Sequence, residues 1–527
     1  MLEKCAVNWM AGVPAVVKPA TVTSYLTAAM VEDIVASGIL PEGAIQLICG
    51  SANGILDHVM SQDVVTFTGS ASTGRMLKAH PRLIDESVPF NMEADSLNAI
   101  VLGPDATPDT EEFTLFIKEV GKEITLKCGQ RCTGARRILV PKALVEDVQI
   151  ALGKRLGSTV IGDPRTEGVR MGALAGTTQR EEVRRALQEL MQGTEVVFGD
   201  PDSVQVTGAD AKKGAFMSPV LLYNPDPWKV RVSHNVEAFG PVSTLMPYDN
   251  MDDAVALSKL GKGSLCATIA TYDDKVAQQF IWGAASHHGR MLVLNRDMAK
   301  ENTGHGSPLA TLVHGGPGRA GGGEEMGGKR GVLHYLQRTA IQGSPTTITA
   351  LTQQYQQGAK YHITEKHPFQ LHFEELNIGD TLITEKHEVT LKNIEDFAAL
   401  SGDRFYAHMD ENALDGTPFT GRVAHGYFIL SRAAGLFVDP PKGPVLLNYG
   451  IEECRFLKPV YPGSTIQVRF TCKEKLDQEK RPKTEDSPKG ADVARGIVKW
   501  LVDVIDETGE TVALATILTM VKKLDQS

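Results

Sequence analysis

The sequence contains no long apolar run, no excess of basic residues and no regular spacing of cysteines. Its longest early apolar stretch, residues 6–17, includes Asn8 and Pro14 and is too short to span a bilayer, so we expect no secretory or transmembrane segment. A formal net charge of −10 excludes a general attraction for nucleic acid or anionic membranes. The seven irregularly placed cysteines form no disulfide framework, which indicates free thiols and a cytoplasmic location.

The chain also lacks the ligand spacing of a structural metal site. Cys128 and Cys132 lie four residues apart without a second pair of cysteines. The histidines His362, His367 and His372 are five residues apart and share no helix face. We therefore expect no metal.

Two differently patterned regions make up the 527 residues, which are too many for one ordinary core. Up to about residue 335, short β-rich runs such as 44–48 and 64–68 alternate with helix-like segments such as 24–37. Strands that alternate with helices predict βαβ units around a mostly parallel sheet, an α/β fold.

The second region follows a glycine-dense tract at residues 315–331. A helix at 426–437 and alternating strands between 450 and 521 predict one buried helix wrapped by an antiparallel sheet, an α+β fold. The charged segment 478–491 is predicted to be a solvated loop. The expected organisation is a first domain, a linker and a second domain, at residues 1–343, 344–368 and 369–527.

A helix is predicted just before one chemically notable cysteine. Phe113, Phe116, Val120 and Ile124 recur at helical spacing, so one face of this helix should pack against the sheet. The end of the helix should then deliver the loop that carries Cys132.

Five short motifs occur in the first region, and their order along the chain is informative. They are Lys18-Pro19-Ala20, Phe67-Thr68-Gly69-Ser70, Asn91-Met92-Glu93, Gly129-Gln130-Arg131-Cys132-Thr133 and Glu237-Ala238-Phe239-Gly240-Pro241. Together they resemble the aldehyde dehydrogenase superfamily over roughly residues 1–335. The resemblance implies that Cys132 is the nucleophile that forms a thiohemiacetal, that a nicotinamide accepts its hydride, and that Glu93 activates the water that hydrolyses the thioester.

The same resemblance implies a cofactor site. Ser70, at a helix start, is expected to meet the pyrophosphate, and Lys18 the adenosine ribose. Glu237 is expected to bind the nicotinamide ribose, with Phe239 packed beside the ring. At Thr21 many NAD-preferring relatives carry a glutamate that repels a 2′-phosphate, so we expect NADP to be the cofactor.

The family resemblance further implies segments upstream of Met1, namely more strands, an oligomerisation hairpin and an oxyanion-hole asparagine that Asn8 does not match. A chain without that donor is expected to oxidise aldehydes about 100- to 1000-fold more slowly. The resemblance also implies a homo-oligomer.

A second chemical signature lies in the second region. Asp403 and His408 stand in the run Ser401–His408, and the run Val423–Tyr427 follows. These residues resemble the MaoC-like enoyl-CoA hydratases of the hot-dog fold over about residues 345–527. The resemblance implies that Asp403 and His408 hold a water, and that Gly426 offers its N–H to the thioester carbonyl.

Both resemblances in this order are those of bifunctional enzymes of phenylacetate catabolism. They imply a CoA-thioester substrate, ring-opening of oxepin-CoA by water addition, and NADP-dependent oxidation of the resulting semialdehyde to the acid. Two alternatives stay open. One is an (R)-specific enoyl-CoA hydratase with an inactive, structural dehydrogenase region, and the other is a purely structural protein. We expect no nucleic-acid or membrane partner.

Overall fold

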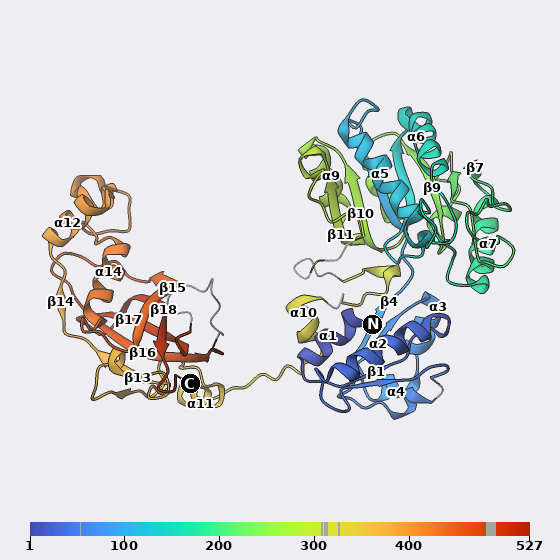
Figure 1. Cartoon of the computed structure of the whole chain (residues 1–527). Coiled ribbons are helices and arrows are strands. Elements are labelled where there is room, and N and C mark those ends of the chain that lie inside the picture. Colours follow the sequence, from blue (N-terminus) through green and yellow to red (C-terminus); the bar gives the residue numbers. More distant parts are fainter. Residues whose placement is uncertain (53, 307–308, 310–314, 325–326, 481–491, 527) are drawn as a thin grey trace. The chain divides into compact units, whose positions relative to one another are not determined.

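The computed structural model describes residues 1–527 except 53, 307–308, 310–314, 325–326, 481–491 and 527 (Figure 1). The chain divides into two compact units, Met1–Arg338 and Thr339–Ser527. The domain limits set at 343 and 368 stay predictions. Most of the charged loop expected at 478–491 lies outside the described residues. The seven cysteines are free thiols. Among the described helices, none is long and apolar enough to cross a membrane.

A seven-stranded sheet forms the centre of the first unit, in the order β11-β10-β5-β6-β9-β8-β7. Its strands are β5 (Asn98–Leu102), β6 (Ala135–Pro141), β7 (Glu195–Phe198), β8 (Val220–Tyr223), β9 (Val242–Tyr248), β10 (Ser264–Ala270) and β11 (His288–Leu294). Six strands run parallel and only the edge strand β7 is antiparallel. Strands β5, β9 and β10 are buried along their whole length, as expected for a sheet covered on both faces. The predicted parallel α/β fold is confirmed.

Helices cover both faces of this sheet (Figure 1). One face packs against α5 (Glu111–Thr125) and α6 (Val145–Gly157), and the other against α8 (Met251–Lys259) and α9 (Asp274–Ala284). The stripe predicted on α5 is buried, with Phe116 and Val120 fully so. The helix starts where it does because the Thr110 hydroxyl accepts a hydrogen bond from the Phe113 N–H at 3.2 Å.

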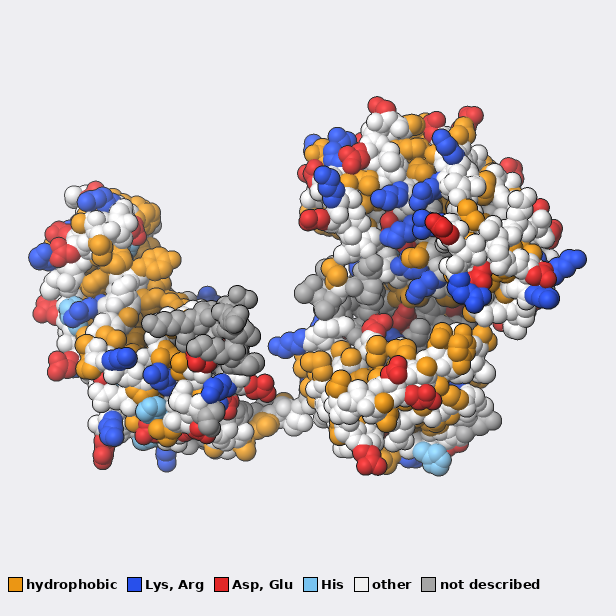
Figure 2. Space-filling view, in the orientation of Figure 1, with side chains coloured by type: hydrophobic (Ala, Val, Ile, Leu, Met, Phe, Trp, Pro, Cys, Tyr) orange, Lys and Arg blue, Asp and Glu red, His pale blue; other side chains and the backbone are white. Residues whose placement is uncertain are grey.

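The rest of the first unit contains two parallel strand pairs, β1 (Ala15–Val17) with β2 (Ile45–Leu47) and β3 (Val65–Thr68) with β4 (Phe90–Glu93). Its other helices are α1 (Leu2–Met10), α2 (Ser24–Ser37), α3 (Ala71–Lys78), α4 (Pro81–Asp85), α7 (Thr177–Met191) and α10 (Gly328–His334). No residue of α2 is buried. Hydrophobic side chains, including Tyr25 and Val35, are therefore exposed in this part of the unit (Figure 2).

A buried arginine on β6 connects neighbouring elements of the first unit by hydrogen bonds. Arg137 on β6 is fully buried and donates hydrogen bonds to the carbonyl oxygens of Leu97, Leu257 and Ser258 at 2.7–2.9 Å. Burial lowers the pKa of its guanidinium to about 9. The start of β5 and the end of α8 are thereby joined to the middle of β6.

The second unit is built on an antiparallel sheet in the order β12-β13-β16-β17-β18-β15, with β14 also paired to β16. Its strands are β12 (His362–Ile363), β13 (Asp380–Ile383), β14 (His387–Glu388), β15 (Val445–Phe456), β16 (Thr465–Asp477), β17 (Arg495–Asp506) and β18 (Thr511–Lys522). Only the short pair β12 and β13 is parallel. Its helices are α11 (Pro345–Thr352), α12 (Leu391–Ser401), α13 (Tyr406–Met409) and α14 (Gly426–Phe437).

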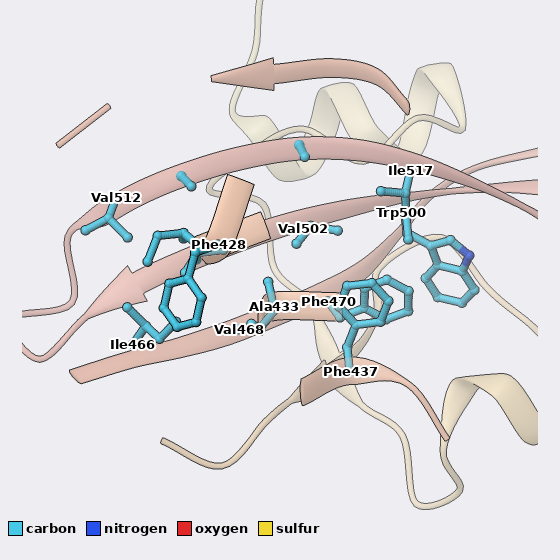
Figure 3. Close-up of a cluster of buried hydrophobic side chains, with 14 of the residues drawn as sticks. Phe428, Ala433, Phe437, Ile466, Val468, Phe470, Trp500, Val502, Val512 and Ile517 are labelled. Carbon is cyan, nitrogen blue, oxygen red and sulfur yellow. The ribbon is translucent and has the colours of Figure 1, made fainter. Parts of the chain in front are cut away.

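Helix α14 lies against this sheet and contributes the buried side chains Phe428, Ile429, Ala433 and Phe437 to the core (Figure 3). Its residues Phe428 and Phe437 pack on the inner side chains of β16 to β18. The rings of Phe437, Phe470 and Trp500 form a continuous stack, with 4.4 Å between successive centroids. One buried helix on an antiparallel sheet confirms the expected hot-dog arrangement.

Replacement of Phe470 by alanine should lower the free energy of unfolding of the second unit by about 3 to 5 kcal/mol, because a fully buried ring is lost and a cavity is left. Differential scanning calorimetry of the full chain measures this. Leu476→Ala is the control on the same strand, where the side chain is 38% exposed, and should cost less than about 1 kcal/mol. Equal losses for the two variants would show that Phe470 is not central to this core.

Candidate active sites

The thiol of Cys132 lies in the loop between α5 and β6, and that loop starts with a tight turn. Lys127, Cys128 and Gly129 have positive φ angles of 53°, 53° and 67°. At Gly129 a Cβ atom would lie 2.1 Å from the carbonyl oxygen of Gly240. Glycine is needed there because it alone allows this close approach of two backbones.

The buried side-chain amide of Asn98 holds the loop that carries Cys132. Asn98, at the start of β5, donates from Nδ2 to the carbonyl oxygens of Cys132 at 2.8 Å and Gly134 at 2.9 Å. Its Oδ1 accepts from the Ser96 hydroxyl at 2.5 Å and from the Cys266 N–H at 3.0 Å. Both donors and both acceptor sites of the amide are used, so the backbone on either side of the thiol is pinned to β5.

The structure brings Glu93 and Cys132 together, as the sequence predicted. Glu93 ends β4, and its carboxylate lies near enough to the thiol to raise the pKa of the thiol. Burial and then the charge of Glu93 raise the pKa of the Cys132 thiol to about 12, so the thiol keeps its proton until a base removes it. The Lys4 ammonium lies 3.2 Å from Glu93 Oε2. Burial lowers the pKa of Lys4, but the charges of Glu93 and Glu3 outweigh this and raise it overall.

Glu237 and Phe239 meet at one arginine. Glu237 accepts hydrogen bonds from the Ser96 N–H at 3.1 Å and from Arg136 Nε at 3.3 Å. The Arg136 guanidinium also lies 5.5 Å from the centre of the Phe239 ring. Burial raises the pKa of Glu237 and the charge of Arg136 opposes the rise. Because Ser96 also contacts Asn98, Glu237 and the Cys132 loop share one hydrogen-bond network.

The other three residues predicted to bind the cofactor lie at the surface. Lys18 directly follows β1, Thr21 opens a 3₁₀-helix, and both are exposed. Ser70 caps α3, where its hydroxyl accepts from the Thr73 N–H at 3.3 Å. Within the described part of the chain, no hydrogen bond or ion pair connects these three residues to Cys132.

Three side chains converge at the chemical centre of the second unit. Gly402 ends α12 with a left-handed backbone, φ 81°, and so turns the chain toward Asp403. His408 lies in α13 and His425 directly precedes α14. One carboxylate oxygen of Asp403 and one ring nitrogen of each histidine lie within 4.8 Å of one another. The predicted pair Asp403 and His408 is therefore assembled, together with a third group.

Backbone carbonyls orient the two imidazole rings. His408 Nδ1 lies 2.7 Å from the carbonyl oxygen of Val423, and His425 Nε2 lies 2.9 Å from that of Asp403. The rings are stacked, with centroids 3.8 Å apart. Burial lowers the pKa of His425, which favours its neutral form. The position of each ring is thus determined by a backbone carbonyl in a segment that carries the other predicted site residues.

Gly426 opens α14, as predicted, next to this cluster. A Cβ atom there would lie 2.6 Å from the ring of Phe456, so any other residue would displace that ring. The first N–H groups of a helix have no partner within the helix and carry its positive dipole end. The start of α14 is therefore suited to an oxygen that gains negative charge.

Four residues of these sites were not predicted from the sequence: Lys4, Asn98, Arg136 and His425. Asn98 and Arg136 are polar residues near the start of mostly apolar strands, and His425 stands within a motif already noted, so the sequence contained an indication of each. No local sequence pattern indicated Lys4, because its partner Glu93 lies 89 residues away in the sequence.

Comparison with protein families agrees with this division. Residues 1–341 match the aldehyde dehydrogenase family, and residues 374–493 match the MaoC like domain. The first match covers more than half of the chain.

Two curated relatives are markedly similar. Protein MaoC of Klebsiella aerogenes is 49% identical over 319 residues, which are 60% of this chain and 93% of that protein. The 3,4-dehydroadipyl-CoA semialdehyde dehydrogenase of Aromatoleum evansii is 44% identical over 315 residues, 60% of this chain and 61% of that protein. The chain thus spans less than two thirds of the second relative.

Solved structures support the fold of the first unit. Aldehyde dehydrogenase C from Pseudomonas syringae, in a complex with NAD+ and octanal, superposes with a TM-score of 0.54 at 24% identity, over 64% of this chain and 65% of that one. A betaine aldehyde dehydrogenase from Staphylococcus aureus gives 0.56 at 23% identity, over 64% of each chain. The chain therefore belongs to the aldehyde dehydrogenase family and carries a MaoC-like domain fused behind its dehydrogenase domain.

Proposed function

We propose that this chain is a bifunctional enzyme that opens oxepin-CoA by water addition and oxidises the resulting CoA-linked semialdehyde to the acid with NADP. The observation that carries the proposal is that each unit assembles its own reactive set, Cys132 with Glu93 in one and Asp403 with His408 in the other. The name of the Aromatoleum relative, which acts on a CoA-linked semialdehyde, supports the substrate class.

In the first unit the proposed base is Glu93. It removes the proton from the Cys132 thiol, whose sulfur then attacks the aldehyde carbon and forms a thiohemiacetal. Asn98 holds the loop, so the sulfur stays in position during attack. Glu93 passes the thiol proton to the aldehyde oxygen and is ionised again. After oxidation, Glu93 takes a proton from the water that attacks the thioester carbon and gives it to the sulfur, so that Cys132 leaves as the thiol. Lys4 stabilises the charged form of Glu93 between these steps.

The residues present fit a nicotinamide nucleotide, which supplies the hydride acceptor when it is bound. The two oxygens of Glu237 each have one protein partner, which leaves lone pairs for the hydroxyls of a ribose. Phe239 keeps 37% of its surface exposed and offers a ring beside them. Ser70, at the start of α3, lies where a helix dipole favours phosphate. Thr21 and Lys18 supply no negative charge against a 2′-phosphate, which supports NADP.

In the second unit the proposed catalytic pair is Asp403 and His408, which share one water. The pair takes a proton from this water while its oxygen bonds to the carbon β to the thioester, and the α carbon then receives a proton. Charge gathers on the thioester oxygen as the enolate forms. The N–H of Gly426 and the dipole of α14 stabilise that charge. In oxepin-CoA the product of this addition opens to the aldehyde.

We also propose that the chain forms a homo-oligomer. Strand β15 is an edge strand of twelve residues, most of them exposed, and includes Leu447 and Ile451. Such an edge is unusual on a monomer, because unpaired backbone groups beside apolar side chains favour pairing with another chain.

The two activities should be separable by single substitutions. Cys132→Ala should abolish aldehyde oxidation but leave hydration intact, and Asp403→Asn should slow hydration by at least about 100-fold but leave oxidation intact, since an amide is not a base. Opening of oxepin-CoA and NADPH formation from a separately supplied aldehyde are measured independently, because Asp403→Asn produces no aldehyde of its own. Cys128→Ala and Asp410→Asn are the matched controls. If either test variant loses both activities while it stays folded, the assignment of separate sites is wrong.

Cofactor preference should respond to the residue at position 21. Thr21→Glu should reduce kcat/KM for NADP relative to NAD by at least about tenfold, because a carboxylate repels the 2′-phosphate. Thr23→Glu in the same 3₁₀-helix serves as the control for added charge. Unchanged preference in Thr21→Glu would remove this residue from the cofactor site.

Glu93→Gln should make Cys132 more reactive toward iodoacetamide at pH 8, although it should abolish aldehyde oxidation. Loss of the carboxylate charge lowers the raised pKa of the thiol, so more thiolate is present, and a rise of at least about threefold is expected. Peptide mass spectrometry follows each cysteine. Cys128 is the internal control, because burial alone raises its pKa to about 12. Slower labelling of Cys132 would show that Glu93 acts on the thiol mainly as its base, and that the effect of its charge on the thiol pKa is minor.

A further inference from the structure

Arg136 binds two segments of the dehydrogenase site at once. It is the second residue of β6, and its side chain is 4% exposed. Its Nε donates to Glu237 Oε1 at 3.3 Å, and one terminal nitrogen donates to the Gly240 carbonyl oxygen at 2.9 Å. The other terminal nitrogen donates to the carbonyl oxygens of Gly129 at 2.8 Å and Arg131 at 3.2 Å. Every nitrogen of the buried guanidinium is therefore used, in the planar geometry that only arginine offers.

These acceptors belong to the two segments on which the chemistry of the first unit depends. Gly129 lies in the turn that leads to Cys132, and Gly240 directly follows Phe239. The backbones of the two segments touch at this point, since a Cβ atom on Gly129 would lie 2.1 Å from the Gly240 carbonyl oxygen. Arg136 binds the carbonyl oxygens of both glycines and so spans the contact between the segments.

The contact of Arg136 with Glu237 is electrostatic as well as geometric. The two side chains are only 4% and 9% exposed, so solvent screens their charges weakly. Burial raises the pKa of Glu237, and the charge of Arg136 opposes the rise. The guanidinium also lies 5.5 Å from the centre of the Phe239 ring. Arg136 therefore favours the charged form of one residue predicted to bind the cofactor and contacts another.

The neighbouring Arg137 shows what a purely structural arginine does in the same strand. Successive side chains of a strand point to opposite faces, and Arg137 donates to carbonyl oxygens just before β5 and in α8. None of these oxygens belongs to the Cys132 turn or to segment 237–240. Of the two arginines, Arg136 is the one whose hydrogen bonds end on the segments that carry predicted site residues.

We propose that Arg136 is a positioning residue of aldehyde oxidation, which holds the Cys132 turn and segment 237–240 at a fixed separation. This inference rests on the proposed function, in which the first segment carries the nucleophile and the second binds the nicotinamide nucleotide. An error of about 1 Å in the placement of reacting groups can cost about 100-fold in rate. One guanidinium that binds both segments removes this freedom. Arg136 acts through the two segments and not on the reacting atoms.

Two readouts that need no turnover test this role in the full chain. The first is the rate at which iodoacetamide labels Cys132 without cofactor, followed by peptide mass spectrometry. The second is calorimetric titration with NADP and with NAD. Arg136→Gln should speed the labelling at least about fivefold, because the released turn exposes the thiol and lowers its raised pKa. It should also weaken nucleotide binding at least about tenfold, because Glu237 loses its cation.

Two further variants separate this role from a general effect on stability. Arg136→Lys keeps the charge but offers one ammonium to four acceptors, so it should retain the faster labelling. Arg82→Gln is the matched control, since Arg82 donates to the Val59 carbonyl at 2.8 Å and pairs with Glu86 at 3.0 Å, both outside the two segments. Labelling of Cys266, which is buried on β10, reports general opening of the unit and should stay slow in every variant.

Labelling of Cys132 at the wild-type rate in Arg136→Gln, or in Arg136→Lys if the glutamine variant does not fold, would overturn the proposal. Labelling of Cys266 that rises by the same factor would also overturn it, because the effect would then be a loosening of the whole unit. Unchanged nucleotide affinity in Arg136→Gln would show that segment 237–240 does not depend on Arg136. A wild-type chain that binds neither nucleotide contradicts the proposed function instead, and labelling of Cys132 then still decides whether Arg136 holds the turn.

Discussion

The cost of a buried polar group without a partner governs how the first unit is built. Arg137 lies within the sheet and is stable there only because carbonyl oxygens from β5 and α8 accept its hydrogen bonds. One of these carbonyls belongs to Leu97, between Ser96 and Asn98. The two neighbours in turn hold Glu237 and the Cys132 loop. The dehydrogenase site therefore depends on a chain of satisfied polar groups that starts in the core.

The second unit positions its site differently. Its core is apolar, and the aromatic stack of Phe437, Phe470 and Trp500 secures α14 against the sheet. Because α14 is secured, His425 at its start has a defined place, and its ring binds the carbonyl of Asp403. The acidic residue is thus held through its backbone carbonyl, and its Oδ1 also accepts a hydrogen bond from the Phe405 N–H at 3.2 Å. Among the described residues, Nδ1 of the buried His425 ring has no hydrogen-bond partner, and this exception lies in the cluster where function is expected.

Glycine has a different task at each site. Gly129 permits a backbone approach that any Cβ would block, whereas Gly402 provides a left-handed residue that ends a helix just before Asp403. Gly402 turns the chain directly before Asp403, and Gly129 turns it three residues before Cys132. In the two units, unrelated folds thus place an acid or a nucleophile at the end of a helix, where a loop can present it.

Local features of this protein were determined by its sequence alone. The helix at 24–37, the packed stripe of α5 and the buried helix at 426–437 follow from side-chain periodicity, which depends only on neighbouring residues. The motif order was enough to predict Glu93 beside Cys132. Only the tertiary structure decided the contacts of Lys4 with Glu93, of Arg136 with Glu237 and of His425 with Asp403. These partners lie 89, 101 and 22 residues apart, and their meeting depends on strand order and register, which local patterns do not specify.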